Sequence, residues 1–94
     1  MTTYAVRYTY DERSDVRDTV RPEHRAYLTS LLERGALHAS GPFSDDGEPG
    51  ALLLLEAADD DELAGLLSAD PFARERLVAR TDVRAWTVAV GSLA

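Results

Sequence analysis

The hydrophobic pattern of this chain changes its period several times within 94 residues, and this succession restricts the folds that the chain can adopt. Residues 3–10 alternate with a period of two, which predicts a strand with one aromatic and apolar face. A polar loop is expected over residues 11–18. From Pro22 to Gly35 the period becomes that of an amphipathic helix. Its apolar stripe consists of His24, Tyr27, Leu28, Leu31 and Leu32.

The second half of the chain repeats this alternation of strand and helix. A strand is predicted over residues 36–43, an acidic hairpin loop over 44–50 and a leucine-rich strand over 50–56. Asp59 and Glu62 form a capping pattern that opens a second helix, and Asp70-Pro71 starts a short further turn. A last strand is expected over residues 83–90. This order predicts an α+β fold, a ferredoxin-like βαββαβ split sheet, in a single domain of residues 1–94.

The third predicted strand is apolar at every position from Ala51 to Leu55. Such a run is typical of a strand that is covered on both faces. Helices of the same chain can cover one face, so a partner subunit is expected on the other. The sequence therefore predicts a homodimer formed through the sheet.

Composition excludes several classes of function. The formal net charge is −7, and an acidic surface without a basic stripe argues against a nucleic-acid partner. No cysteine is present, so thiolate and disulfide chemistry is excluded, and the absence of lysine excludes a Schiff base on a lysine amine. No apolar run is long enough to cross a bilayer, and no secretion leader is recognisable at the start. A cytoplasmic location is the expectation.

His24 and Asp70 are the strongest candidates for chemistry. A histidine on the apolar face of a helix either packs structurally or acts as a general base near neutral pH. Asp70 precedes a proline and is a good helix cap. The two roles of Asp70 are compatible, because a capping carboxylate has a second oxygen that can accept a hydrogen bond from an imidazole. The pattern alone leaves the structural and the catalytic interpretations open.

Other polar residues are weaker candidates. Ser40, Arg7 and Tyr27 are predicted to contact a substrate, and Arg84 is a further arginine that an anionic substrate could use. His38 and His24 match no metal-ligand spacing, so neither a metal nor a cofactor is expected. The acidic run at residues 59–62 is better explained as the negatively charged start of a helix than as a calcium site.

The chain as a whole resembles the YciI-like (YCII-related) domain family. The resemblance covers nearly the full length and depends on motifs in a fixed order. These are a short first strand, His24 early in the first helix, Gly35-Ala36-Leu37 leading to Ser40-Gly41-Pro42, an acidic hairpin before a leucine-rich strand, and Asp70-Pro71-Phe72 before the last strand. One departure is Ala85, which precedes Trp86 where relatives often have proline.

The resemblance implies a dimeric α+β barrel similar to muconolactone isomerase, with a site built from His24 and Asp70 and with Ser40 nearby. Some relatives act as dehydrochlorinases on hydroxylated aromatic compounds. The leading hypothesis is therefore a small enzyme that uses a His–Asp dyad to move a proton in an elimination or isomerisation of a small cyclic or carbonyl compound. The alternatives are a non-catalytic dimer that binds a small molecule or serves as an accessory module, and a purely structural dimer.

Overall fold

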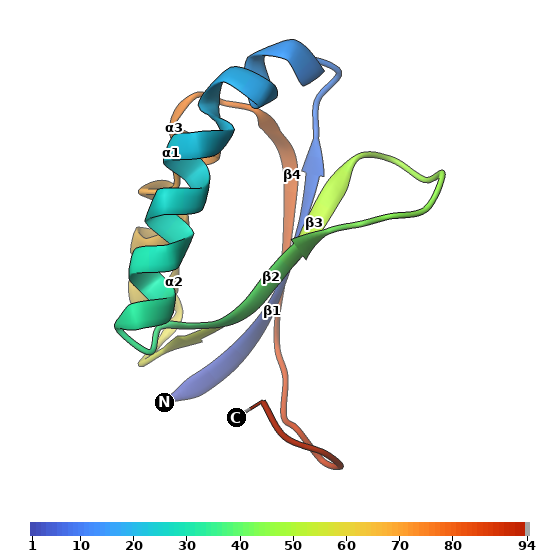
Figure 1. Cartoon of the computed structure of the whole chain (residues 1–94). Helices are drawn as coiled ribbons and strands as arrows, with labels where there is room; N and C mark the ends of the chain where they lie inside the picture. Colours follow the sequence, from blue (N-terminus) through green and yellow to red (C-terminus); the bar gives the residue numbers. More distant parts are fainter. Residues whose placement is uncertain (94) are drawn as a thin grey trace.

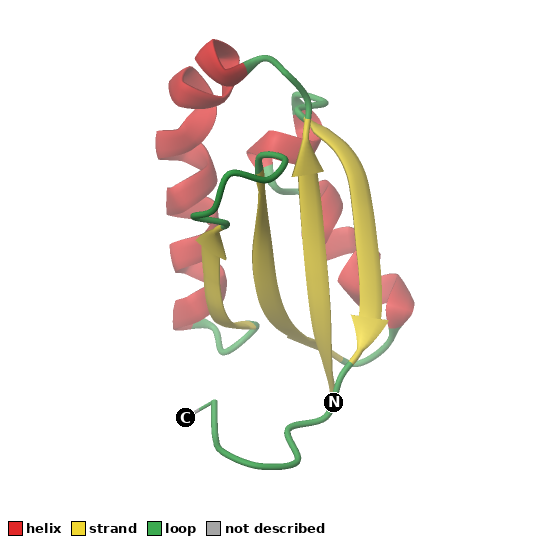
Figure 2. Ribbon diagram, turned by 90° about the vertical axis from the view of Figure 1, so that its right-hand side faces the viewer, coloured by secondary structure: helices red, strands yellow, loops and turns green. Residues whose placement is uncertain are grey.

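Four antiparallel strands form one sheet in the order β2-β3-β1-β4, and all helices lie on one face of it (Figures 1 and 2). The computed structural model describes residues 1–93. In chain order the elements are β1 (Thr2–Tyr10), α1 (Ser14–Glu33), β2 (Leu37–Pro42), β3 (Gly50–Ala57), α2 (Asp60–Ser68), α3 (Pro71–Arg74) and β4 (Val78–Ala85). The predicted α+β ferredoxin-like fold is confirmed.

The core lies between the helices and the sheet. On β1 the alternation predicted from the sequence buries Tyr4, Val6 and Tyr8. On β3 it buries Leu53 and Leu55, each at most 1% exposed. Leu28 and Leu31 of α1 and Leu63 of α2 close the core from the helix side. Full burial of one such leucine contributes about 1.5–3 kcal/mol, so these few residues hold the helix layer on the sheet.

No helix of residues 1–93 covers the other face of the sheet (Figure 2). Arg7 and Leu52 lie opposite each other there, and Leu52 is 41% exposed. The apolar residues of β3 that alternate with the buried ones therefore point to this open face. They are the residues that the predicted partner subunit would cover.

The first helix begins two turns earlier than predicted. The loop expected over residues 11–18 is mostly helical, and Pro22 lies inside α1 instead of at its start. The additional turns are held by Arg17, which is buried, donates to the Asp11 carbonyl and has its guanidinium 5.0 Å from the centre of the Tyr10 ring. Pro22 removes only one backbone hydrogen bond, and these contacts offset that loss.

The last strand is also displaced from its predicted position. It occupies Val78–Ala85 instead of residues 83–90, because its register with β1 runs from Tyr10↔Val78 to Tyr4↔Ala85. The Trp86 amide donates to the carbonyl of Thr3, which is the second residue of β1, so β4 has no further partner beyond this point. Residues 87–93 run beyond the edge of the sheet (Figure 1), so the alternating apolar residues of this segment have no strand to pair with.

The caps predicted from the sequence are present. The Asp59 side chain accepts the Glu62 amide at the start of α2, and the Asp70 side chain accepts the Phe72 amide at the start of α3. Gly35 follows α1 with a φ of 75°, a conformation that favours glycine. The cap at Asp70 matters most here, because it fixes a carboxylate directly beneath α1.

Candidate active site

His24 and Asp70 meet in the interior between α1 and α3. His24 Nδ1 lies 2.7 Å from Asp70 Oδ1, and the two residues are 8% and 1% exposed. The spacing along α1 turns His24 toward the core, and the helical turn that begins at Pro71 brings Asp70 up to it. The pair that the sequence predicted is therefore present as a buried hydrogen-bonded contact.

Asp70 accepts three hydrogen bonds from three different elements. Oδ1 accepts from the imidazole and from the Phe72 amide at 3.0 Å, while Oδ2 accepts from the Tyr8 hydroxyl at 2.9 Å. The expectation that the imidazole would take the oxygen left free by capping was wrong, because Oδ1 does both and Tyr8 occupies the other oxygen. Three donors stabilise the carboxylate without a cationic side chain.

Tyr8 is held as a donor by its surroundings. Burial raises the pKa of its phenol far above the ordinary value, and the neighbouring Asp70 carboxylate raises that pKa further. The pKa of Tyr10 is raised to about 12, first by burial and then by Asp70. Since the Phe72 amide and the protonated Tyr8 phenol both donate to it, the Asp70 carboxylate acts as the acceptor in all three of its hydrogen bonds. The proton shared with His24 therefore belongs on Nδ1, which leaves the lone pair of the neutral ring on Nε2.

The imidazole is also fixed by aromatic packing. The Phe72 ring stacks on it with a centroid distance of 3.9 Å and an angle of 4° between the planes. Tyr10 meets Phe72 edge to face, with the two ring centres 5.4 Å apart. Because Phe72 is itself 1% exposed, the imidazole cannot turn about its bond to the helix without disturbing the core.

Nε2 of His24 opens to a cleft. Within residues 1–93 this atom has no hydrogen-bond partner. Every buried side-chain nitrogen or oxygen of these residues does have one, so Nε2 is not buried and a ligand can reach it. The cleft has a volume of about 210 Å³ and lies between α1 and the end of β2. Leu28, Pro42 and Leu53 contribute apolar walls and Ser40 contributes a hydroxyl. This arrangement combines an oriented base with a small, largely apolar cavity.

The other predicted site residues do not all meet here. Ser40 lines the cleft. The hydroxyl of Tyr27 donates to the Leu66 carbonyl, which directs this side chain toward α2 instead of the cleft. Arg7 lies on the open face of the sheet, where it pairs with Asp82 at 3.1 Å. The structure thus brings together His24, Asp70 and Ser40 and places Tyr27 and Arg7 elsewhere.

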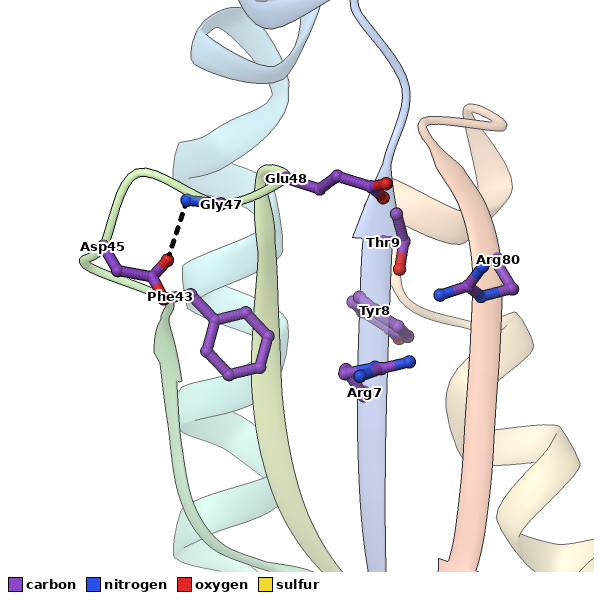
Figure 3. Close-up of a pocket in the computed structure, with 8 residues that line it drawn as sticks. All are labelled: Arg7, Tyr8, Thr9, Phe43, Asp45, Gly47, Glu48 and Arg80. Carbon is purple, nitrogen blue, oxygen red and sulfur yellow. Dashed lines mark hydrogen bonds between the residues drawn. The ribbon is translucent and has the colours of Figure 1, made fainter.

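A second hollow, of about 360 Å³, lies on the open face around Arg7 (Figure 3). Arg80 lies beside it on β4, and the acidic loop that joins β2 to β3 overhangs it with Asp45 and Glu48. Arg84 is exposed on β4. No histidine is among the residues that line this hollow, and it shares no lining residue with the cleft at His24.

His38 lies on β2, where it bonds Glu56 of β3. Among the described residues no group of three or more metal-ligating side chains is present. No helix in residues 1–93 is long and apolar enough to cross a membrane.

Sequence reasoning missed Tyr8 and Phe72 as parts of the site. Tyr8 lies on the aromatic and apolar face predicted for the first strand, a pattern that fits a core or a pocket, and its partner Asp70 lies 62 positions away. Phe72 had a clearer signal, since the residue two positions after a capping Asp70 must lie close to the carboxylate that accepts its amide.

A family model confirms the resemblance. The model of the YCII-related domain matches residues 1–87. The chain belongs to the YCII-related domain family. No curated protein matches the sequence.

Solved structures extend this relationship. The chain is 27% identical to the 5-chloro-2-hydroxyhydroquinone dehydrochlorinase TftG of Burkholderia phenoliruptrix AC1100, solved in complex with 2,5-dihydroxybenzoquinone, over 90% of this chain and 93% of that one, with a TM-score of 0.80. An antibiotic biosynthesis monooxygenase shares 14% identity over 96% of this chain and 100% of that chain, with a TM-score of 0.59. A mutant of the cofactor-independent oxygenase SnoaB of Streptomyces nogalater shares 13% identity over 96% of this chain and 94% of that chain, with a TM-score of 0.54. The last two show a shared fold alone.

The hydrogen bond from Tyr8 to Asp70 gives a testable prediction. Tyr8→Phe removes a donor to a buried carboxylate, so we expect the free energy of unfolding at pH 7 to fall by about 1.5–3 kcal/mol. Tyr27→Phe removes a hydroxyl that donates to a neutral carbonyl and is expected to cost only about 0.5–1.5 kcal/mol. Urea unfolding at one fixed protein concentration measures both values.

The same variant changes the response to alkali. The folded-state pKa of Tyr8 is raised, so the folded chain keeps this proton above pH 10 whereas the unfolded chain loses it. Stability therefore decreases as pH rises through and above 10, by about 1.4 kcal/mol per pH unit for each such tyrosine. In Tyr8→Phe, the slope of the free energy of unfolding against pH should be reduced by the contribution of one tyrosine. An unchanged slope would contradict the burial and bonding described for Tyr8.

Proposed function

We propose that this protein is a cofactor-independent enzyme that moves a proton in the elimination or isomerisation of a small cyclic or carbonyl compound, with His24 as the general base. The observation that carries the proposal is the state of the imidazole. Asp70 holds Nδ1 while Nε2 faces the cleft. A base oriented in this way contributes about 10²–10⁴-fold to a rate, which suffices for a carbon acid that is already activated by a carbonyl.

The reaction needs no group beyond these residues. Nε2 takes a proton from an acidic C–H or O–H bond of the substrate, and the electron pair of that bond forms a new C=C or C=O double bond. In an elimination a leaving group such as chloride departs with its own electron pair, whereas in an isomerisation the imidazolium returns the proton to another carbon. Asp70 stabilises the imidazolium while it exists, and the Ser40 hydroxyl donates to an oxygen of the substrate.

The size of the cleft and the similarity to TftG support a ring compound as substrate. A dry cavity of about 150 Å³ holds benzene, and the cleft of about 210 Å³ leaves room for ring substituents. TftG is a dehydrochlorinase whose structure holds 2,5-dihydroxybenzoquinone. We therefore place the substrate of this chain among small oxygenated six-membered rings.

We further propose that two copies pack through the open faces of their sheets. Leu52 and Phe43 are 41% and 43% exposed on or beside that face. Arg7 and Arg80 share the single carboxylate of Asp82, which leaves positive charge on the face, while the overhanging loop carries several acidic residues. A two-fold axis would bring the loop of one copy toward the arginines of the other and would cover the leucines.

The role of His24 can be tested with 5-chloro-2-hydroxyhydroquinone, the compound on which TftG acts. We expect His24→Gln to lower kcat/KM for chloride release by about 10²–10⁴-fold, because the base is lost while a side chain of similar volume remains. Chloride is followed with a selective electrode under anaerobic conditions. His38→Gln is the matched control and should keep the wild-type rate, since His38 lies at Glu56 outside the cleft.

Equal rates for the wild type and His24→Gln would overturn the assignment of the base. Saturable binding of the compound by the wild type, with no chloride release above buffer, would instead favour a binding module. The melting temperature of His24→Gln is measured in parallel, so that unfolding is not mistaken for loss of the base.

Dimerisation through the open face is tested with Leu52→Asp. Two aspartates facing each other across a two-fold axis would repel and would lose apolar contact, so we expect a monomer in sedimentation equilibrium where the wild type has twice the mass of one chain. Leu32→Asp is the matched control, because Leu32 is 53% exposed on α1 and lies away from the sheet. A wild-type monomer, or a Leu52→Asp dimer, would contradict the proposed interface.

A further inference from the structure

The cleft at His24 has a charge opposite to that of the protein. The chain carries 17 acidic residues and a formal net charge of −7, yet no aspartate or glutamate is among the residues that line this cleft. Arg21 and Arg25 line it together with His24. In a protein with this composition, two arginines around one small cavity are a marked local concentration of positive charge.

The geometry of α1 explains how both arginines reach the cleft. Arg21 and Arg25 are four residues apart, so they lie on one face of the helix one turn from each other. Arg25 is an exposed residue. The cleft lies on the side of α1 that faces the end of β2, and Arg25 and Ser40 both line it.

The two arginines differ in how they are engaged. Nη1 of Arg21 is bound to the Asp18 carboxylate, one turn earlier on α1. Arg25 makes no hydrogen bond and no ion pair with any residue in the described range 1–93. All the N–H donors of the Arg25 guanidinium are therefore available to a ligand, and a planar guanidinium is suited to a planar oxyanion.

We infer that the cleft selects an anion: a small ring compound with an enolate, phenolate or carboxylate oxygen that Arg25 binds and Arg21 supports. The inference rests on the proposed function and extends it, because it names the charge class of the substrate and the residue that recognises it. With the oxyanion at Arg25, the opposite edge of the ring turns toward Nε2 of His24. Arg25 is thus a substrate-binding residue that directly follows the base in the sequence of α1.

This placement also serves the proton transfer. When Nε2 removes a proton from a C–H or O–H bond of the substrate, the electron pair of that bond is delocalised onto the conjugated oxygens, and negative charge increases there. Arg25 faces that charge across a cavity whose other walls are largely apolar, among them Leu28 and Leu53. The charge on this oxygen is larger in the transition state than in the ground state, so Arg25 would stabilise the transition state more.

Binding of two probes tests the inference without any turnover. The first is 2,5-dihydroxybenzoquinone, whose hydroxyl groups are vinylogous carboxylic acids and ionise at neutral pH. The second is hydroquinone, a neutral ring of similar size. We expect the wild type to bind the anion more tightly, and Arg25→Gln to weaken anion binding by about ten- to a hundredfold while the affinity for hydroquinone is unchanged. Isothermal titration calorimetry measures each dissociation constant.

Arg34→Gln is the matched control. Arg34 follows the end of α1, does not line the cleft and should leave both affinities at their wild-type values. Added salt should weaken anion binding by the wild type more than by Arg25→Gln, since one charge contact has been removed from the variant. Equal anion affinity of Arg25→Gln and wild type would overturn the inference, and so would a wild type that does not prefer the anion.

The experiment separates this inference from the proposed function. His24→Gln is expected to lose chloride release but to retain anion binding, because the base does not carry the anion. If His24→Gln keeps full turnover while Arg25→Gln loses the anion, the general base is refuted and the anion site stands. If turnover depends on His24 but anion binding ignores Arg25, the reverse holds.

Discussion

The buried carboxylate of Asp70 is the interaction on which the site and much of the fold depend. It accepts the Phe72 amide as the cap of α3, the Tyr8 hydroxyl from β1 and the imidazole of His24 from α1. Three elements that are distant in the sequence are thereby joined at one group that is 1% exposed. A buried charge with fewer donors would be costly, so each of the three contacts supports the other two.

Structural and functional roles coincide at this carboxylate. Capping requires Asp70 to be an acceptor, and an acceptor at Nδ1 leaves Nε2 of His24 as the only ring nitrogen that can take a proton from a ligand. Phe72, placed by the same cap, stacks on the ring and holds its plane. The strained or unpaired groups found at many active sites are not needed here. The hydrogen bonds around Asp70 hold the imidazole in place, and Nε2 of His24 remains accessible to a ligand.

The elements that periodicity predicted correctly are those whose pattern is set by near neighbours. The strand at β1, the Asp59 cap and the Asp70 cap belong to this class. The two displaced boundaries depended on contacts outside the periodic pattern: Arg17 against Tyr10 extends α1 before Pro22, and β4 ends where its antiparallel partner β1 begins. Within the site, His24 and Asp70 were identifiable from the sequence. Tyr8 was not, because no local pattern links residues 62 positions apart.

The central claim is that Asp70 fixes the proton of the neutral imidazole on Nδ1. The chain contains two histidines, so nitrogen NMR of the ¹⁵N-labelled protein, at a pH where both rings are neutral, resolves the two tautomers directly. We expect His24 to carry its proton on Nδ1 and His38, whose Nε2 bonds Glu56, to carry it on Nε2. The His38→Gln variant assigns the signals. A proton on Nε2 of His24, or a mixture of its tautomers, would contradict the account, because the lone pair would then face Asp70 instead of the cleft.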